Sequence, residues 1–502
     1  MNIRYYILIV FIFVLHFCCI AQINKPYVLS EFKSQDFETM LEFCQRGGIE
    51  VLIQKKPFET YGHYNWNVDF APEGEESVRQ MVATAAMEGV DLGVWVQDNA
   101  VSVHDAFFSP EYYKQFRRGD QLELYSAITA EDNTIAMRRS DVLRQPASLN
   151  LLVIDDELIS YSTLEFSGEL ALIHRCTRGA YGTKAAPHDV DAKAYRIWDS
   201  PDRFVEPEGE LRDLVAQNLN QKLRFFQVKL FKNATPQEMI EENIRVSQVK
   251  RWEEEGTVSS LGWFMIRPSD KRRLGTTMEE LEWMLSKAAG FDTGYGLLID
   301  PKTITNHGMM AELLKTLNHW NRLMRQGRLT ERQRTLLCDP YLDWHLVPQD
   351  SAHYLIYPQV VSRRFRCHFE ESDYGVLRSE TWTWNAEEGG AFGLRLQVDG
   401  TTEILNPMVN TSRGLVMFPC VIKPGQCLMY DFGDTARVVD AAFHVLEEVT
   451  IEGLAELDKG DNEVYFLCEA NPVAKQRPEV TLRYIIREQP EIVTLENTPH
   501  QW

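Results

Sequence analysis

Three aspartates lie at or just after the ends of short apolar segments, where strands are predicted to end. Asp98 and Asp105 follow the segment 90–96, and Asp300 follows the segment 294–299. Two carboxylates that face one bound molecule can act as general acid and general base. Aspartate also caps helices and forms turns, so each position has a structural explanation as well. We predict Asp98 and Asp300 as catalytic residues, with Asp105 as a third candidate.

A loop after the apolar segment 49–53 combines aromatic and hydrogen-bonding side chains. It holds His63, Tyr64 and Trp66 beside a glycine. Aromatic faces stack on the apolar faces of sugar rings, whereas a histidine can hydrogen-bond to hydroxyl groups. The same loop composition would also suit a packed lid on a core. We predict that these three residues bind the substrate.

Two further polar residues follow other predicted strands. His104 precedes Asp105, and could hydrogen-bond to a ligand there. Arg267 follows the apolar segment 261–266, where a guanidinium suits a carboxylate, sulfate or phosphate group. A structural ion pair with an acidic neighbour is the alternative for Arg267. We predict both residues as substrate-binding.

The elements that must position these residues alternate between strands and helices. Buried strands are predicted over 49–53, 90–96, 223–231, 261–266 and 294–299. Helices are predicted over 36–46, 75–88, 208–221, 235–255, 276–290 and 309–327. Short joints between strand and helix imply parallel strands with right-handed crossovers. The pattern predicts an α/β fold, a (β/α)8-type barrel that need not be regular, whose active site lies at the carboxyl ends of the strands.

Two β-rich segments interrupt or follow this pattern. Residues from about 122 to 198 show only hairpin-like strands, which predicts a β-module inserted in the barrel domain 22–347. Its Arg178-Gly179 and His188 are predicted to be architectural. Residues 348–490 alternate short strands and turns, which predicts an antiparallel β-sandwich of jelly-roll type. Residues 491–502 are predicted to be a tail.

Charge and composition exclude several classes of function. The chain has 52 basic and 73 acidic residues and a formal net charge of −21, with 44% hydrophobic residues. An acidic protein lacks the basic surface that nucleic acids and anionic membranes attract. The cysteines show no metal-site spacing, although Cys420 and Cys427 could bridge a hairpin. We expect no metal, no cofactor, no nucleic-acid partner and no membrane span, and the oligomeric state stays open.

The first residues predict export. Arg4 precedes an apolar run over 5–20, and small residues lead to Ala21 before Gln22. This is the pattern of a cleaved signal peptide, here 1–21, and the run is short for a membrane span. We predict a periplasmic or extracellular protein. A lipid anchor on Cys18 or Cys19 is disfavoured by the Phe17-Cys18 context.

Three segments carry a resemblance to a known group. They are the loop 62–64, the segment 178–183 and the stretch 282–295. The chain resembles secreted glycoside-hydrolase-like TIM-barrel proteins of polysaccharide-degrading Bacteroidota, which carry a C-terminal β-sandwich. The resemblance covers residues 25–347 and implies a carbohydrate-active enzyme with a polysaccharide or oligosaccharide ligand.

One departure from that group leaves alternatives open. Such proteins usually present an acidic residue at the end of a central strand, whereas the segment 223–231 ends in Leu230-Phe231 followed by Lys232. A glycosidase acting on a plant or host glycan is our first hypothesis. A polysaccharide lyase, with a His63, Tyr64 and Arg267 set acting on a uronate, is the second. A non-catalytic glycan-binding protein is the third, and the missing acid favours it.

Overall fold

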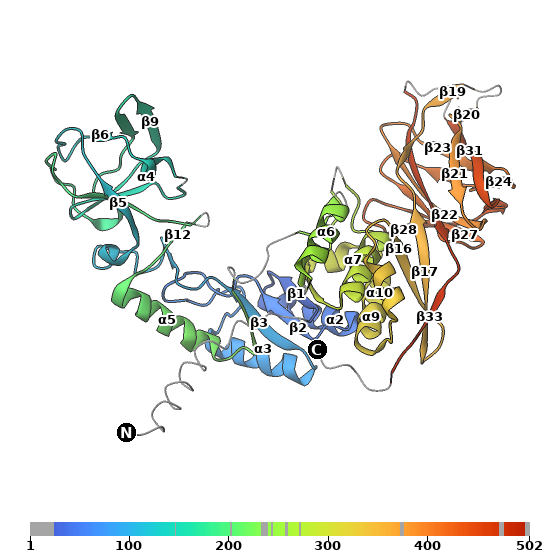
Figure 1. Ribbon diagram of the computed structural model, residues 1–502, viewed down its shortest axis with the longest axis horizontal. Coiled ribbons are helices and arrows are strands. Elements are labelled where there is room, and N and C mark those ends of the chain that lie inside the picture. The colour runs from blue at the N-terminus through green and yellow to red at the C-terminus, as the bar shows by residue number, and fades with distance from the viewer. Residues whose placement is uncertain are drawn as a thin grey trace.

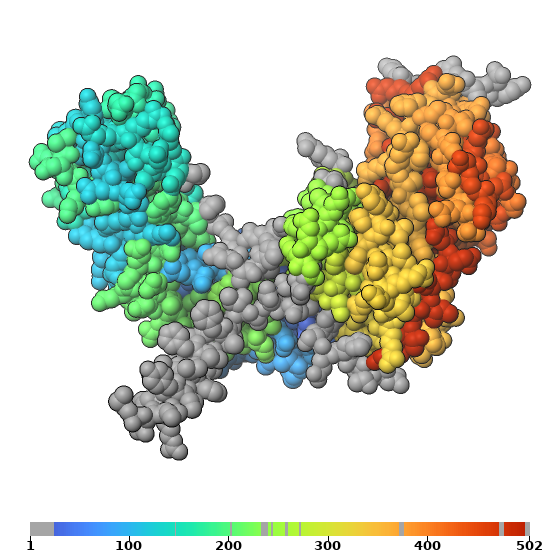
Figure 2. Space-filling view, viewed as in Figure 1, coloured from blue at the N-terminus to red at the C-terminus, as the bar shows by residue number. Residues whose placement is uncertain are grey.

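The computed structural model describes residues 25–496, apart from 146, 201–202, 232–238, 242–243, 257–259, 271–272, 372–375 and 471–475. Along the chain it contains a parallel sheet with helices, an inserted β-module and a C-terminal β-domain. The two β-rich parts stand on opposite sides of the parallel sheet (Figures 1 and 2). The predicted signal peptide lies outside the described residues.

The parallel sheet has the strand order of an opened (β/α)8-type barrel. Its strands are β1 (Tyr27–Ser30), β2 (Val51–Gln54), β3 (Asp91–Val96), β13 (Val228–Phe231), β14 (Ser260–Met265) and β15 (Gly294–Leu298). Their order is β13-β3-β2-β1-β15-β14. In a closed barrel each strand pairs with the next and the last pairs with the first. Here β1 pairs in parallel with both β2 and β15, while β13 and β14 are edges of the described sheet.

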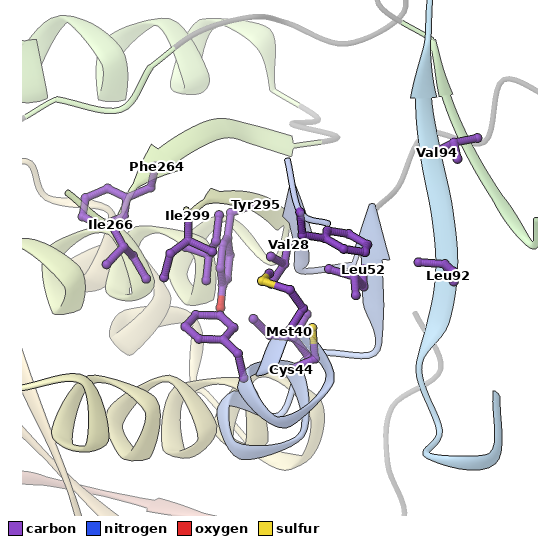
Figure 3. Close-up of a cluster of buried hydrophobic side chains, with 14 of the residues drawn as sticks. Val28, Met40, Cys44, Leu52, Leu92, Val94, Phe264, Ile266, Tyr295 and Ile299 are labelled. Atoms are coloured by element: carbon purple, nitrogen blue, oxygen red, sulfur yellow. The ribbon is translucent and has the colours of Figure 1, made fainter. Parts of the chain in front are cut away.

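Side chains alternate between the two faces of this sheet, as the period of a strand requires. On the face that lines the barrel interior, an apolar cluster includes Tyr27, Ile53, Leu230 and Trp263. Gly296 has no side chain because a Cβ there would lie 2.6 Å from the Trp263 ring. On the other face the strands pack on helices, and Figure 3 shows side chains from β1, β2 and β15 gathered around those of helix α2.

The helices follow the predicted pattern with differences at their ends. They are α2 (Phe37–Gly47), α3 (Glu75–Met87), α5 (Gly209–Leu223), α6 (Arg245–Glu255), α7 (Met278–Phe291), α8 (Pro301–Asn306), α9 (Met310–Gln326) and α10 (Glu331–Cys338). The helix predicted over 235–255 begins only at Arg245, and Met239 instead pairs in parallel with Trp263. The strand predicted from residue 223 begins at Val228, because α5 continues through Leu223. Strand β1 is not among the predicted elements.

The inserted module forms two small antiparallel sheets around its own core. One sheet has the order β5-β11-β7-β8 and the other β6-β10-β9. The strands are β5 (Arg118–Leu122), β6 (Thr134–Arg138), β7 (Leu151–Ile154), β8 (Glu157–Ser160), β9 (Thr163–Ser167), β10 (Leu170–His174) and β11 (Ala194–Ile197), with a short helix α4 (Asp141–Arg144). The short strands β4 (Val101–Ser102) and β12 (Phe204–Val205) pair where the chain enters and leaves the module.

Glu157 holds the end of this module together. Its carboxylate, which is 1% exposed, accepts hydrogen bonds from Arg178 Nε and Nη2, both at 2.8 Å. It also accepts from the backbone N–H groups of Gly179 and Ala186 and lies 2.8 Å from His188 Nε2. Burial raises the pKa of Glu157, but the bonds from Arg178, Gly179, His188 and Ala186 outweigh it, so the pKa lies below its usual value. Arg178 and His188 therefore have the architectural role predicted for them.

The C-terminal β-domain consists of two antiparallel sheets over a shared apolar core. The first sheet contains β16 (Asp343–Pro348), β17 (His353–Val361), β18 (Phe365–Arg366), β22 (Gly390–Asp399), β26 (Cys427–Tyr430), β27 (Thr435–Val439), β28 (Val445–Thr450), β30 (Glu456–Leu457), β32 (Glu479–Arg487) and β33 (Glu491–Thr494). The second contains β19 (Phe369–Glu371), β20 (Val376–Ser379), β21 (Trp382–Ala386), β23 (Ile404–Thr411), β24 (Gly414–Met417), β25 (Val421–Ile422), β29 (Glu452–Gly453) and β31 (Gly460–Ala470).

The ends of this β-domain differ from the predicted boundaries of 348 and 490. Strand β16 begins at Asp343, and β33 lies in the predicted tail, where it pairs with β17. Its alternating burial is weak, which explains why the sequence pattern misses it. Cys420 and Cys427 are buried free thiols, so the hairpin disulfide considered above is not formed. Among the described residues, no helix is long and apolar enough to cross a membrane.

Candidate functional site

Asp98 lies in a cleft where the barrel meets the inserted module. The cleft has a volume of about 600 Å³ and is lined by residues 97–100, Arg117, 198–200 and 204–206. We call it the junction cleft. The residues 97–100 follow β3 directly, so the cleft opens at the carboxyl end of a central barrel strand. This is the end at which (β/α)8 enzymes place their active sites.

The chain after β3 presents Asp98 to solvent. Asp98 is exposed, and among the described residues its carboxylate has no hydrogen-bond or ion-pair partner. The next residue, Asn99, has a φ of 46°, which is left-handed backbone that costs energy for a side chain other than glycine. The Asn99 Oδ1 atom is buried without a hydrogen-bond partner in the described part of the chain. A strained residue and an unused acceptor at one place are typical of functional sites.

Glu206, at the end of β12, supplies a second carboxylate. Its Oε2 atom lies 2.7 Å from Arg117 Nη1, and its Oε1 accepts from Asn99 Nδ2 at 3.2 Å. The Arg117 N–H also donates to the Glu206 carbonyl at 2.8 Å. Glu206 is thus held beside the loop that carries Asp98. Sequence analysis missed Glu206, because Asn99 and Glu206 are 107 residues apart and the segment around Glu206 carries no motif.

The remaining walls of the junction cleft are aromatic and polar. Trp198 and Phe204 line it, and the Phe204 ring packs on Tyr61 with 4.7 Å between centroids. Asp199 also lines the cleft, but its Oδ2 accepts from the Ser148 N–H and hydroxyl and from the Leu149 N–H. These bonds give Asp199 a structural role. The cleft therefore contains two carboxylates and aromatic surface. Glu206 is hydrogen-bonded, whereas Asp98 has no partner among the described residues.

His63 and Asp105 form a pair outside the residues that line this cleft. Asp105 Oδ1 lies 2.7 Å from His63 Nδ1, and Asp105 Oδ2 accepts from the His63 N–H at 2.9 Å. The Asp105 side chain is fully buried, and the His63 ring stacks on Phe107 at 3.9 Å. A Cβ on Gly62 would lie 2.7 Å from Asp105, so this loop requires glycine. Asp105 thus organises the loop and orients a half-exposed histidine.

The other predicted binding residues are not part of the wall of the junction cleft, although Tyr64 lies near Asp98. Tyr64 is buried, its hydroxyl donates to the Gln97 carbonyl at 3.3 Å, and burial raises its pKa far above the usual value. Trp66 packs on Phe58 with 5.0 Å between ring centroids. His104 is exposed. None of the three lines the junction cleft.

Arg267 and Asp300 each have a local partner. Arg267 Nη2 lies 2.7 Å from Glu280 Oε1, which is the ion pair that sequence analysis gave as the alternative. Asp300 caps α8, because its Oδ1 accepts from the Lys302 N–H at 2.8 Å. Asp300 is not among the residues that line the junction cleft. Catalytic or binding roles for both residues stay predictions.

Apolar side chains from several strands pack against one another in the interior of the barrel. Trp263 donates to the Tyr27 hydroxyl at 2.6 Å and meets Trp95 edge to face at 5.7 Å. Strand β13 ends at Phe231. Among the described residues, the interior cluster joins side chains of β1, β2, β13 and β14. Among the same residues, no group of three or more His, Cys, Asp or Glu side chains could hold a metal ion.

Comparisons with known proteins find no matching family model and no matching curated protein. Among solved structures, an Anoxybacillus alpha-amylase is similar over 90% of this chain and 99% of its own, at 7% identity and a TM-score of 0.33. A noncanonic maltogenic alpha-amylase from Thermotoga neapolitana is similar over 86% and 99%, at 9% identity and a TM-score of 0.32. A GH36 alpha-galactosidase from Geobacillus stearothermophilus is similar over 90% of this chain and 56% of its own, at 10% identity and a TM-score of 0.28. With TM-scores this low, the strand order of the sheet and not these similarities defines the fold.

Proposed function

We propose that the protein is an exported glycoside hydrolase and that the junction cleft binds its sugar substrate. One observation carries the proposal. Asp98, a carboxylate without a partner in the described residues, lies in one cleft with Glu206, a second carboxylate held by Arg117 and Asn99. Glycoside hydrolysis needs two carboxylates on either side of the scissile bond. The place of Asp98 after β3 agrees with this chemistry, whereas Glu206 follows β12, which pairs with β4 outside the parallel sheet.

The rest of the cleft supports the same use. Its volume of about 600 Å³ lies within the range of small-molecule sites. Trp198 and Phe204 offer aromatic surface to the apolar face of a sugar ring. In this proposal Asp98 exchanges the proton with the glycosidic oxygen or the attacking water. Glu206 is the second carboxylate, and Arg117 sets its orientation.

The test is product formation by the mature chain, from Gln22 onward, on a panel of neutral and acidic polysaccharides. New reducing ends are expected. Asp98→Asn and Glu206→Gln should each lower kcat by about 10²–10⁴-fold, which is the usual contribution of a general acid or base. Glu123→Gln is the matched control, because Glu123 pairs with Arg138 in the inserted module, away from the cleft. Full activity of both Asp98→Asn and Glu206→Gln would contradict the assignment.

The variant Asp300→Asn distinguishes the catalytic pair Asp98 and Glu206 from the pair Asp98 and Asp300 that the sequence predicts. If Asp300→Asn loses activity while Glu206→Gln keeps it, Asp98 acts with Asp300 instead of Glu206. The Asn side chain can still cap α8, so the fold is retained in this variant. Circular dichroism of each variant checks that the loss is not unfolding.

A glycan-binding protein without turnover is a second candidate. It is favoured by the sequence at the end of β13, where Lys232 and Asn233, and no carboxylate, follow Phe231. Saturable glycan binding without products, unchanged by Asp98→Asn, would support it. Clean turnover would refute it.

The lyase alternative is not favoured by the placement of its three residues. Arg267 is paired with Glu280, and Tyr64 is buried against Gln97. A lyase would release unsaturated products that absorb ultraviolet light. The same panel, followed by absorbance, tests this alternative directly.

Export is the part of the proposal that rests on sequence alone. The segment 1–21 has the charge, apolar core and small residues of a signal peptide. Expression of the full chain in a Gram-negative host, followed by fractionation and N-terminal sequencing, tests it. Cleaved protein that begins at Gln22 in the periplasm or medium is expected. Uncleaved protein in the cytoplasm would contradict export.

A further inference from the structure

A second cavity lies between the barrel helices and the C-terminal β-domain. Its volume is about 380 Å³, and its walls come from α7, α9, β16 and the face of the large sheet that contains β17 and β32. Figure 1 shows these helices beside that sheet. The exposed side chains of Glu312 and Lys315 form part of the wall, so the cavity reaches solvent. We call it the helix–sheet cavity.

Two of the guanidinium groups in this cavity are fully paired. Arg395 Nη2 lies 2.6 Å from Glu279 and 2.5 Å from Asp431. Arg437 lies 2.7 Å from Glu312 and 3.3 Å from Asp431. These four ion pairs connect the helices α7 and α9 to the sheet. Arg395 and Arg437 together balance two of the three negative charges of Glu279, Glu312 and Asp431.

Glu282, the remaining acid of the cavity, accepts hydrogen bonds from Trp320, Leu346 and His345. It is 1% exposed, and its Oε1 accepts from Trp320 Nε1 at 3.1 Å and from the Leu346 N–H at 3.0 Å. Its Oε2 lies 2.8 Å from His345 Nδ1. Because a carboxylate only accepts, His345 presents Nδ1–H to Glu282. The other ring nitrogen, Nε2, has no hydrogen-bond partner in the described part of the chain.

Two polar side chains on adjacent strands of the sheet are left without partners. Gln359 on β17 is directly opposite Arg487 on β32, so both side chains stand on the same face of the sheet. Gln359 is 2% exposed, and both residues line the cavity. Within the described residues, neither the Gln359 amide nor the Arg487 guanidinium has a hydrogen-bond acceptor or donor from a side chain or the backbone.

The environment of Arg487 is apolar on one side and open on the other. Its guanidinium packs over the Phe432 ring at 4.3 Å, and its Nε atom is buried without a partner. Burial lowers the pKa of Arg487, and Glu282, Asp431 and Glu279 offset part of that effect from a distance. Arg487 as a whole is partly buried, and a partly buried cation without a contacting carboxylate is less favourable than a paired one.

We propose that the helix–sheet cavity binds a small organic acid, whose carboxylate lies between Arg487 and Gln359. The guanidinium and the amide side chain both offer planar N–H donors, which match the two oxygens of a carboxylate. The cavity is larger than a carboxylate alone, and polar groups of His345, His319 and Thr316 line the rest of it. They suit a ligand with a hydroxylated body, such as an acidic sugar. This site is separate from the junction cleft and does not depend on the function proposed for it.

Calorimetric titration of the mature chain with D-galacturonate tests the proposal, and D-galactose is the neutral probe of the same size. D-Galacturonate should bind saturably in the micromolar to millimolar range, at least tenfold more tightly than D-galactose. Arg487→Met should weaken binding of D-galacturonate at least tenfold, because a charge-assisted pair of bonds is lost. Arg363→Met is the matched control, since Arg363 also packs over a phenylalanine ring, Phe365 at 5.2 Å, but does not line the cavity.

Gln359→Leu is a second variant in case Arg487→Met does not fold. It removes an amide without a partner and leaves little void, and it should weaken binding several-fold. No binding of D-galacturonate, or binding that is unchanged in both variants, would overturn the proposal. Binding of sulfate that depends on Arg487, without binding of D-galacturonate, would also overturn it, because the site would then select a tetrahedral anion.

Discussion

Glu157 in the inserted module and Asp98 in the junction cleft are both acidic residues beside a turn, yet their surroundings differ completely. Glu157 is buried and receives bonds from Arg178, His188 and two backbone N–H groups. Asp98 is exposed and has no partner among the described residues. A carboxylate whose acceptors are all used holds its neighbours in place. One whose acceptors are unused remains available to a substrate.

The same distinction applies to the basic residues at the helix–sheet cavity. Arg395 is bonded to two carboxylates, whereas Arg487 in the same cavity lies near carboxylates but contacts none among the described residues. We therefore expect hydrogen-bond satisfaction to distinguish charges that hold the structure from charges that are available to a ligand. The following variants test that rule, beginning with the largest expected effect.

Glu157→Gln should destabilise the inserted module by about 3–5 kcal/mol, because it leaves the buried charge of Arg178 uncompensated. Hydrogen exchange of the module and chemical denaturation measure this. Glu165→Gln is the control, since Glu165 forms a longer, exposed contact of 3.6 Å with His174 and should change stability by less than about 1 kcal/mol. Equal losses of stability in the two variants would contradict a structural role for the hydrogen bonds of Glu157.

Lys287 should make the stability of the protein depend on pH. It is buried and donates to the carbonyls of Leu337 and Leu342, and burial lowers its pKa to about 7 although Asp343 opposes this. In the unfolded chain its pKa returns to about 10.4. Between these values the unfolded chain binds more protons, so the free energy of unfolding should rise with pH by up to about 1.4 kcal/mol per unit.

Below the pKa of Lys287 in the folded chain, the charged lysine lowers the free energy of unfolding by its full amount. This destabilisation decreases as the pH rises above that pKa. Denaturant titrations at several pH values should show that Lys287→Met removes this slope. Lys302→Met is the control, because Lys302 is exposed. A slope that persists in Lys287→Met would assign the pH dependence to other groups.

Asp300→Ala should cost about 1 kcal/mol of stability, the usual value for a lost helix cap. The reason is the bond from the Lys302 N–H to Asp300, which alanine cannot replace. Asp300→Asn should keep most of the stability, since asparagine also caps helices. Thermal denaturation of both variants measures the difference, and an equal loss in both would argue against a capping role.

Asp98→Asn should change stability by less than about 0.5 kcal/mol, as expected for an exposed side chain without partners. Its effect on turnover should nevertheless be large if the junction cleft is catalytic. Denaturation curves and kcat of the same preparation give both values. A large loss of stability would show that Asp98 has a structural role, and would weaken the distinction from Glu157.

Much of the barrel could be predicted because hydrophobic periodicity reports local structure. The strands after residues 49, 90 and 294 and the helices near residues 75 and 309 lie where the pattern indicates. Strand β1 was missed, although its Tyr27 and Leu29 lie in the barrel interior. Its apolar run is only Tyr27–Ser30, too short to distinguish from a loop.

The candidate site was predicted only in part, for a different reason. Asp98 could be found because a strand end is a local feature of the sequence. Glu206 could not, because its bond to Asn99 joins segments 107 residues apart. The pairing of Asp105 with His63 and of Arg267 with Glu280 likewise depends on side-chain directions that spacing does not reveal.

The sequence by itself determined the α/β pattern, the position of the inserted module and the acidic character of the chain, because these follow from composition and local period. Only the tertiary structure decided that β13 and β14 are not paired with each other in the described part of the chain and that Asp98 shares a cleft with Glu206. It alone also decided that Arg487 faces a cavity without a contacting carboxylate among the described residues. The physical reason is that hydrogen-bond satisfaction is a property of neighbours in space, and the neighbours of these residues come from distant parts of the chain.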